Sequence, residues 1–182
     1  MIVLSGASAS GKTEAAKMLT AKYGIVKAIT TTTRPMRLHE KDGRDYFFVS
    51  KERFQEMIKE DLFVEYTLYN GNYYGSTKDQ IADNRSVVID LEGLKSYSSL
   101  CDKRIVTFYL STSEEVRYRR MLERGDKEED AKRRIENDKK LFASENIPNV
   151  NYRIDSENKS IEQVADEVYR LYCKSIKALQ NK

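Results

Sequence analysis

The 182-residue sequence has little of several residue types that mark specialised protein classes. It contains two cysteines, two prolines, one histidine and no tryptophan. Because two cysteines without a C-x-x-C pair are too few for a disulfide framework, we expect Cys101 and Cys173 to be reduced packing residues. The single histidine, His39, has no partner pattern and is interpreted as a surface loop residue.

Long apolar runs are also missing. No stretch approaches the roughly 20 apolar residues that a membrane span requires. The start at Met1 runs directly into an apolar segment and leaves no room for a signal peptide, so we expect a cytoplasmic protein without a membrane anchor.

Neither sign of charge is in large excess. The 32 Lys and Arg residues balance 29 Asp and Glu residues, giving a net charge of +3, and both signs are interleaved. This balance does not suggest a nucleic-acid-binding arm, so no nucleic-acid partner is expected. The length is suited to one compact α/β domain and is too short for two ordinary domains.

Segments rich in β-branched and aromatic residues alternate with helical patterns, which is typical of βαβ units around a parallel sheet. The core strands are expected at residues 2–4, 26–30, 86–90, 105–110 and 152–154. Between residues 31 and 77 the pattern becomes β-rich, with a helix over 51–59 and a hairpin turn at Asn70-Gly71. Residues 119–140 are nearly all charged around Gly125, which by itself indicates a solvated helical hairpin.

The sequence GASASGKT at residues 6–13 matches the phosphate-binding pattern G-x-x-x-x-G-K-S/T. It follows a short apolar strand and precedes a helical pattern, which disfavours the alternative of a simple glycine turn with a surface lysine. Backbone N–H groups and the helix N-terminus would surround the phosphates of a nucleotide. The predicted ATP-binding residues are Gly6, Ala7, Ser8, Ala9, Ser10, Gly11, Lys12 and Thr13.

Two residues of this motif have specific predicted roles. Lys12 is expected to reach the β and γ oxygens of ATP, and Thr13 is the predicted ligand of Mg²⁺ through its hydroxyl. A P-loop does not identify the group that accepts the phosphoryl group. In the following loop, Arg34 and Arg37 lie three residues apart, and two guanidinium groups suit a phosphate dianion. Without other context, a basic surface turn explains this pair equally well.

Further motifs follow in a fixed order: T-T-R-x-x-R, G-x-D-Y-x-F, F-x-E, N-Y-Y-G-S and I-D-x-x-G. In this order and over nearly the whole chain, the sequence resembles guanylate kinases. The resemblance implies a P-loop kinase fold with a five-stranded parallel core sheet flanked by helices. It divides the chain into a core at residues 1–30, 78–118 and 141–182, a β-rich NMP-binding subdomain at 31–77 and a helical lid at 119–140.

The resemblance also implies the reaction, which is phosphorylation of GMP and dGMP by ATP with Mg²⁺. Lys12, Arg34, Arg124 and Arg134 correspond to catalytic residues, the last two being lid arginines. The residues that correspond to GMP ligands are Thr30, Arg34, Arg37, Tyr46, Glu65, Tyr74, Ser76 and Asp90. Tyr73 is instead expected to pack within the hairpin.

Guanine chemistry agrees with this assignment of Glu65 and Ser76. Guanine presents two adjacent donors, N1–H and the exocyclic amine, which one carboxylate such as Glu65 can accept together. The Ser76 hydroxyl can serve guanine O6, which is a pure acceptor, and Gly75 allows close approach of the backbone.

The sequence departs from the family at three places. Val88 replaces the first carboxylate of a D-I-D run whose second is Asp90, and Asp155 stands where the family commonly has Asn beside the adenine. The segment between Ser76 and Asp90 is several residues shorter, so its helix must be truncated.

Two alternatives remain open on the sequence. One is a related monophosphate kinase with another base preference, and the other is a non-catalytic guanylate-kinase-like module that binds proteins. The intact Gly11-Lys12-Thr13 speaks against the second, because a pure binding module has no use for Lys12. The sequence is compatible with either a monomer or a homodimer.

Overall fold

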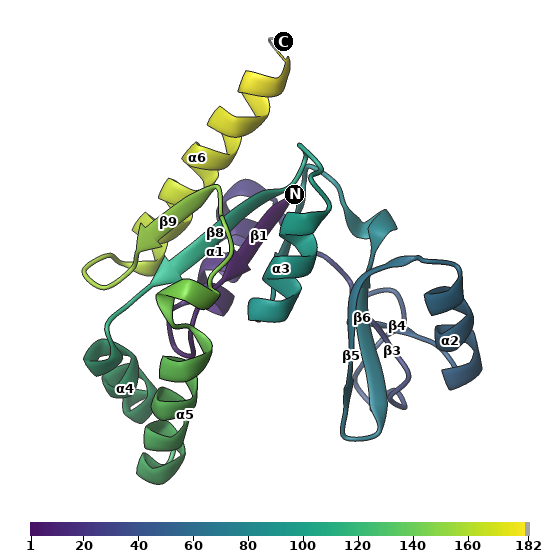
Figure 1. Ribbon diagram of the computed structural model, residues 1–182, viewed down its shortest axis with the longest axis horizontal. Coiled ribbons are helices and arrows are strands. Elements are labelled where there is room, and N and C mark those ends of the chain that lie inside the picture. The colour runs from purple at the N-terminus through teal and green to yellow at the C-terminus, as the bar shows by residue number, and fades with distance from the viewer. Residues whose placement is uncertain (181–182) are drawn as a thin grey trace.

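The computed structural model describes residues 1–180, and side chains as far as residue 178 (Figure 1). The strands are β1 (Ile2–Ser5), β2 (Val26–Lys27), β3 (Thr31–Thr32), β4 (Phe47–Phe48), β5 (Phe63–Tyr69), β6 (Asn72–Thr77), β7 (Arg85–Val88), β8 (Val106–Ser111) and β9 (Tyr152–Asp155). The helices are α1 (Lys12–Tyr23), α2 (Lys51–Lys59), α3 (Leu91–Ser99), α4 (Glu114–Glu123), α5 (Glu128–Leu141) and α6 (Ile161–Gln180), with short 3₁₀ turns η1 (Lys78–Gln80) and η2 (Ser144–Asn146).

The core is a five-stranded parallel sheet in the order β2-β7-β1-β8-β9. Strand β1 lies at its centre and is fully buried, as expected for a parallel sheet covered by helices on both faces. One face packs against α1 and α6 through an apolar cluster that includes Leu19 and Val168. The opposite face packs against α3 through Leu94 and Tyr97. The predicted α/β fold with a five-stranded parallel core is confirmed.

Two predicted core strands end earlier than expected. The strand expected at residues 86–90 ends as β7 at Val88, and the strand expected at residues 26–30 loses most of its length. The sequence suggested a strand over residues 26–30, but β2 ends at Lys27. The Ala28 N–H still donates to the Ser86 carbonyl at 2.7 Å, whereas the Ile29 N–H donates to the Gln80 side chain at 3.1 Å. The chain therefore leaves the core sheet after Ala28, and its next strand, β3, belongs to a second sheet.

The second sheet has the order β4-β3-β6-β5 and lies apart from the core in Figure 1. Strands β5 and β6 form the predicted hairpin, in which Asn70 and Gly71 have φ values of 48° and 75°. Positive φ at both central residues matches the right-handed twist of a hairpin. Phe54 of α2 stacks on Phe63 and Tyr73 with ring centroids 4.3 and 5.2 Å apart, so Tyr73 packs in the hairpin as expected.

Helices α4 and α5 form the predicted helical hairpin, which projects from the core at a different place from the second sheet (Figure 1). The connection between β6 and β7 contains only the three-residue turn η1, in agreement with the truncation expected there. His39 lies in an exposed turn, as expected.

The cysteines fit their predicted role only in part. Neither forms a disulfide; Cys173 is half-buried, but Cys101 is exposed in a turn with φ of 50° and is not a packing residue. None of the helices within residues 1–180 combines the length and apolar character needed to cross a membrane.

Candidate active site

The P-loop, residues 6–13, connects the C-terminal end of β1 to the start of α1. Gly6, Ala9 and Gly11 have positive φ, and Gly11 is the N-cap of α1. A Cβ atom at Gly6 would lie 2.4 Å from the Leu110 carbonyl oxygen, so only glycine fits there. The resulting turn presents backbone N–H groups and a helix N-terminus, which together favour an anion.

Lys12 folds back over this loop. Its Nζ donates hydrogen bonds to the carbonyl oxygens of Gly6 and Ala7 at 2.7 and 2.8 Å. Burial lowers the pKa of Lys12 to about 8; the charge of Asp138 opposes this shift, and the guanidinium groups of Arg117 and Arg124 reinforce it. An anionic ligand would therefore be a favourable partner for this partly desolvated amine.

The three hydroxyl side chains of the P-loop differ in exposure. Ser8 is half-buried, and Ser10 is fully buried with no partner for its Oγ among the described residues. Thr13 lies in the first turn of α1 and is exposed. Of the three, Thr13 is the most accessible to a bound metal ion.

A buried ion pair joins the α4–α5 hairpin to the P-loop. The Asp138 Oδ2 atom accepts from Arg117 Nη1 at 2.9 Å and from the Ser8 backbone N–H at 2.7 Å. Arg117 and Asp138 are only 4% and 8% exposed. Sequence reasoning missed both residues because they lie within or beside a charged run that indicated a solvated surface. They anchor the base of the hairpin to the phosphate-binding loop.

The two predicted lid arginines meet at a shared carboxylate. Arg124 ends α4 and binds Asp126 through Nε and Nη2 at 3.1 and 2.6 Å. Arg134 of α5 reaches the same carboxylate at 3.3 Å. Asp126 thus gathers both arginines at the turn of the hairpin, and Arg124 is close enough to Lys12 for its charge to lower the Lys12 pKa.

The two-arginine loop is organised by Glu40, which the sequence did not single out. Arg34 Nη2 donates to Glu40 Oε1 at 2.6 Å, and the Arg37 backbone N–H donates to Glu40 Oε2 at 2.8 Å. These bonds lower the pKa of Glu40. The Arg34 guanidinium lies 5.5 Å from the centre of the Tyr46 ring, while the Arg37 side chain is exposed.

Two predicted tyrosines lie beside this loop. The rings of Tyr46 and Tyr74 meet edge to face, with centroids 6.2 Å apart. The hydrogen bond to Glu40 is the main cause that raises the pKa of Arg34. Arg34, Tyr46 and Tyr74 therefore form one polar and aromatic cluster.

A small cavity of about 200 Å³ lies between the β5–β6 hairpin and the end of β7. It brings together five of the predicted GMP ligands, namely Thr30, Glu65, Tyr74, Ser76 and Asp90. Thr67 also lines it and was not predicted.

Glu65 of β5 lies directly opposite Ser76 of β6 in the sheet register. Burial raises the pKa of Glu65, whereas hydrogen bonding to Ser76 lowers it and the Asp90 charge raises it further. Asp90 caps α3, with Oδ1 accepting from the Gly93 N–H at 2.9 Å. A Cβ atom at Gly75 would lie 2.7 Å from the Phe63 ring, so the backbone of β6 approaches β5 closely here.

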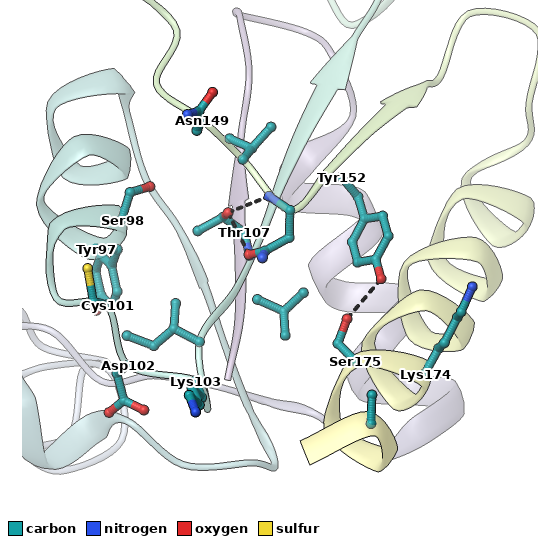
Figure 2. A pocket seen from close by; sticks show the side chains of 15 residues that line it. Tyr97, Ser98, Cys101, Asp102, Lys103, Thr107, Asn149, Tyr152, Lys174 and Ser175 are labelled. Carbon is teal, nitrogen blue, oxygen red and sulfur yellow. Dashed lines mark hydrogen bonds between the residues drawn. The ribbon is translucent and has the colours of Figure 1, made fainter. Parts of the chain in front are cut away.

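A larger cavity, of about 580 Å³, is lined by a different set of residues. Figure 2 shows it from close by. It is bounded by the end of α3, the N-terminal ends of β8 and β9 and the end of α6, at the opposite end of the core strands from the P-loop. Catalytic clefts of parallel sheets form at the carboxyl ends of the strands, so size does not make this cavity the active site.

Comparison with known proteins is consistent with this geometry. The family model described as Guanylate kinase matches residues 1–172. The guanylate kinase of Wolbachia pipientis wMel is 30% identical over 97% of this chain and 92% of its own length. That of Prochlorococcus marinus is 32% identical over 94% and 95%. The crystal structure of guanylate kinase from Anaplasma phagocytophilum has a TM-score of 0.58 and 27% identity, covering 96% of this chain and 84% of that one. Fold, site and sequence together show that the chain belongs to the guanylate kinase family.

Proposed function

We propose that this guanylate kinase transfers the γ-phosphoryl group of ATP to GMP in one in-line step, using the P-loop for ATP and the cavity beside β5 and β6 for GMP. The observation that carries this assignment is the cavity itself, in which Glu65, Ser76 and Asp90 converge. We assign residues 31–77 as the NMP-binding subdomain and residues 119–140 as the lid.

Guanine is recognised through its hydrogen-bond pattern. The Glu65 carboxylate accepts from N1–H and the exocyclic amine, and the Ser76 hydroxyl serves O6. Burial in the protein disfavours the charged form of Glu65, and two donors from guanine would restore it. Guanine thus satisfies a carboxylate that is costly to leave unpaired.

Arg34, Arg37, Tyr46 and Tyr74 hold the phosphate of GMP. Two guanidinium groups match the charge of a dianion and the spacing of its oxygens. When phosphate binds, Arg34 must either keep its hydrogen bond to Glu40 beside the new one or give it up. The exposed Arg37 side chain can approach the phosphate without losing such a contact.

Replacing Arg37 with alanine is expected to raise the KM for GMP by roughly tenfold to a hundredfold, because a hydrogen bond to a charged group contributes about 1.5 to 3 kcal/mol. The KM for ATP should change little, since ATP lies on the P-loop. Arg44→Ala removes an exposed arginine of the same loop and is the matched control. An effect confined to the KM for ATP would show that the subdomain is assigned to the wrong substrate.

Lys12, Arg124 and Arg134 act on the charge that moves during transfer. Thr13 would hold Mg²⁺ through its exposed hydroxyl together with phosphate oxygens and water, since Mg²⁺ keeps several waters and few protein ligands. Within residues 1–180 no cluster of three or more His, Cys, Asp or Glu residues could hold a metal on its own. When bound, Mg²⁺ neutralises phosphate charge and orients the γ-phosphoryl group.

The reaction needs no general base from the protein. A phosphate monoester has a second pKa of about 6 and is already largely a dianion at neutral pH. The protein must instead offset the repulsion between this dianion and ATP, align the two and exclude water. Closure of the NMP-binding subdomain and the lid over both nucleotides would do this.

The direct test is a coupled assay for ADP release from Mg²⁺-ATP with GMP, dGMP, AMP or dTMP added singly. We expect ADP formation that depends on GMP or dGMP, with little from the other two. ADP release at the same rate without any monophosphate would identify a hydrolase and contradict the proposal. A preference for AMP or dTMP would favour the alternative that the protein is a related monophosphate kinase with another base preference.

A further inference from the structure

Arg117 and Asp138 form an ion pair that stability alone does not explain. The pair is almost fully buried, and Arg117 Nε has no hydrogen-bond partner among the described residues. Moving two charges out of water costs free energy that their attraction only partly returns, so apolar residues in the same places are often at least as stabilising. The contacts that the pair makes with the rest of the chain are therefore the better guide to its role.

Both members of the pair contact the backbone of Ser8, a residue of the P-loop. Asp138 Oδ2 accepts from the Ser8 N–H at 2.7 Å, and Arg117 Nη1 donates weakly to the Ser8 carbonyl oxygen at 3.5 Å. The same Nη1 atom donates to Asp138 at 2.9 Å. The peptide groups on both sides of Ser8 are thus held by side chains of α4 and α5.

The residue that follows Ser8 has a backbone conformation that needs such support. Ala9 has a φ of 60°, in the left-handed region that residues with a side chain rarely adopt. A strained residue of this kind persists only where the surrounding structure fixes it. On its other side, Arg120 Nη1 donates to the Ala9 carbonyl oxygen at 3.4 Å. The bond from Ser8 to Asp138 fixes the chain immediately before the strained residue.

We propose that Asp138, with its charge compensated by Arg117, is a positioning residue that holds the P-loop in its nucleotide-binding shape through the Ser8 N–H. This inference rests on the proposed binding of ATP at the P-loop. The N–H groups of such a loop surround the phosphates of the nucleotide. Ordering the loop only when the nucleotide arrives would cost free energy and weaken binding. An acceptor at residue 138 therefore strengthens nucleotide binding without touching the nucleotide.

The test uses two double variants that differ only in whether residue 138 can accept a hydrogen bond. Arg117→Met/Asp138→Asn keeps an oxygen for the Ser8 N–H, and Arg117→Met/Asp138→Leu has none. Asparagine and leucine both have the branched shape of aspartate. Both variants remove both charges, so neither leaves a buried charge unpaired. Isothermal titration calorimetry measures the Kd for Mg²⁺-ADP, the product nucleotide that binds the P-loop without turnover.

We expect the Kd for Mg²⁺-ADP to be roughly fivefold higher in the leucine double variant than in the asparagine double variant, as for one hydrogen bond. The KM for GMP should be the same in both. Adding Ala9→Gly should lower the Kd of the leucine double variant by roughly twofold or more, because glycine adopts positive φ without strain. The same addition should change the asparagine double variant little, since its loop is still held by the Ser8 bond.

Controls separate this role from support of the fold. Asp130→Asn removes an exposed carboxylate of the same helix, which pairs with Arg133 at 2.6 Å, and it should leave the Kd for Mg²⁺-ADP unchanged. Circular dichroism and thermal unfolding check that both double variants fold. If Arg117→Met/Asp138→Leu does not fold, Arg117→Met/Asp138→Ala gives the same comparison with asparagine.

The outcomes are distinguishable from failure of the proposed function. An equal Kd for Mg²⁺-ADP in the two double variants would overturn the role of Asp138, and so would an equal effect of Ala9→Gly in both. An equal loss of Mg²⁺-ADP affinity and of GMP affinity would show that the pair only supports the fold. If the unaltered protein does not bind Mg²⁺-ADP, the proposed use of the P-loop fails and this inference fails with it.

Discussion

Replacing Lys12 with alanine is expected to lower kcat roughly a hundredfold to a thousandfold, the typical effect of removing one preorganised charge-stabilising donor. Among the described residues, Lys12 Nζ donates only to carbonyl oxygens of its own loop, and it is partly desolvated. Its amine is thus available for the β and γ oxygens of ATP, where charge shifts during transfer. Steady-state kinetics with saturating ATP and GMP measure this effect directly.

The fold should survive the substitution, because alanine is the best helix former and Lys12 is the first residue of α1. Lys17→Ala is the matched control, since Lys17 lies on the same helix and pairs only with the exposed Glu14. Near-normal turnover in Lys12→Ala, with circular dichroism and the melting temperature unchanged, would remove Lys12 from the mechanism.

Local features of the fold were predictable from the sequence. The P-loop combines a short apolar strand, glycines and a helix within about 20 residues, and each is specified by nearby residues. The Asn70-Gly71 turn is similarly local, because both residues tolerate positive φ. The helix Lys51–Lys59 is capped at its N-terminus by Ser50, whose side chain accepts from the Arg53 N–H.

Features that depend on distant partners could not be predicted in this way. Residues 26–30 form a continuous β-like run, yet the chain changes sheets after Ala28 because Ile29 binds the Gln80 side chain. Periodicity reports that a segment suits a strand and does not report which sheet it joins.

Charged residues were misread for the same reason. Arg117 is buried because Asp138, 21 positions away, compensates its charge and also binds the Ser8 N–H. A charge run indicates solvent exposure only while its partners are unknown. The sequence also did not indicate the role of Glu40, because that role depends on the loop conformation that brings its carboxylate to Arg34.

Replacing Glu65 with glutamine is expected to cost GMP roughly 2 to 4 kcal/mol of transition-state stabilisation, by analogy with leaving a buried polar group unpaired or opposed. Glutamine removes the charge and turns one acceptor into a donor that faces the donors of guanine. AMP has an acceptor at N1 and should lose much less. The ratio of kcat/KM for GMP to that for AMP should therefore fall at least tenfold, or about 1.4 kcal/mol.

The geometry around Glu65 makes this a test of base reading. Burial raises the pKa of Glu65, so removing its charge relieves a desolvation cost and should not destabilise the fold. Asp61→Asn removes an exposed carboxylate at the start of the same hairpin and should leave the ratio unchanged. If Glu65→Gln lowers both activities equally and the ratio is constant, Glu65 supports the hairpin or its closure. A fall in the ratio with an unchanged melting temperature would instead assign guanine recognition to its carboxylate.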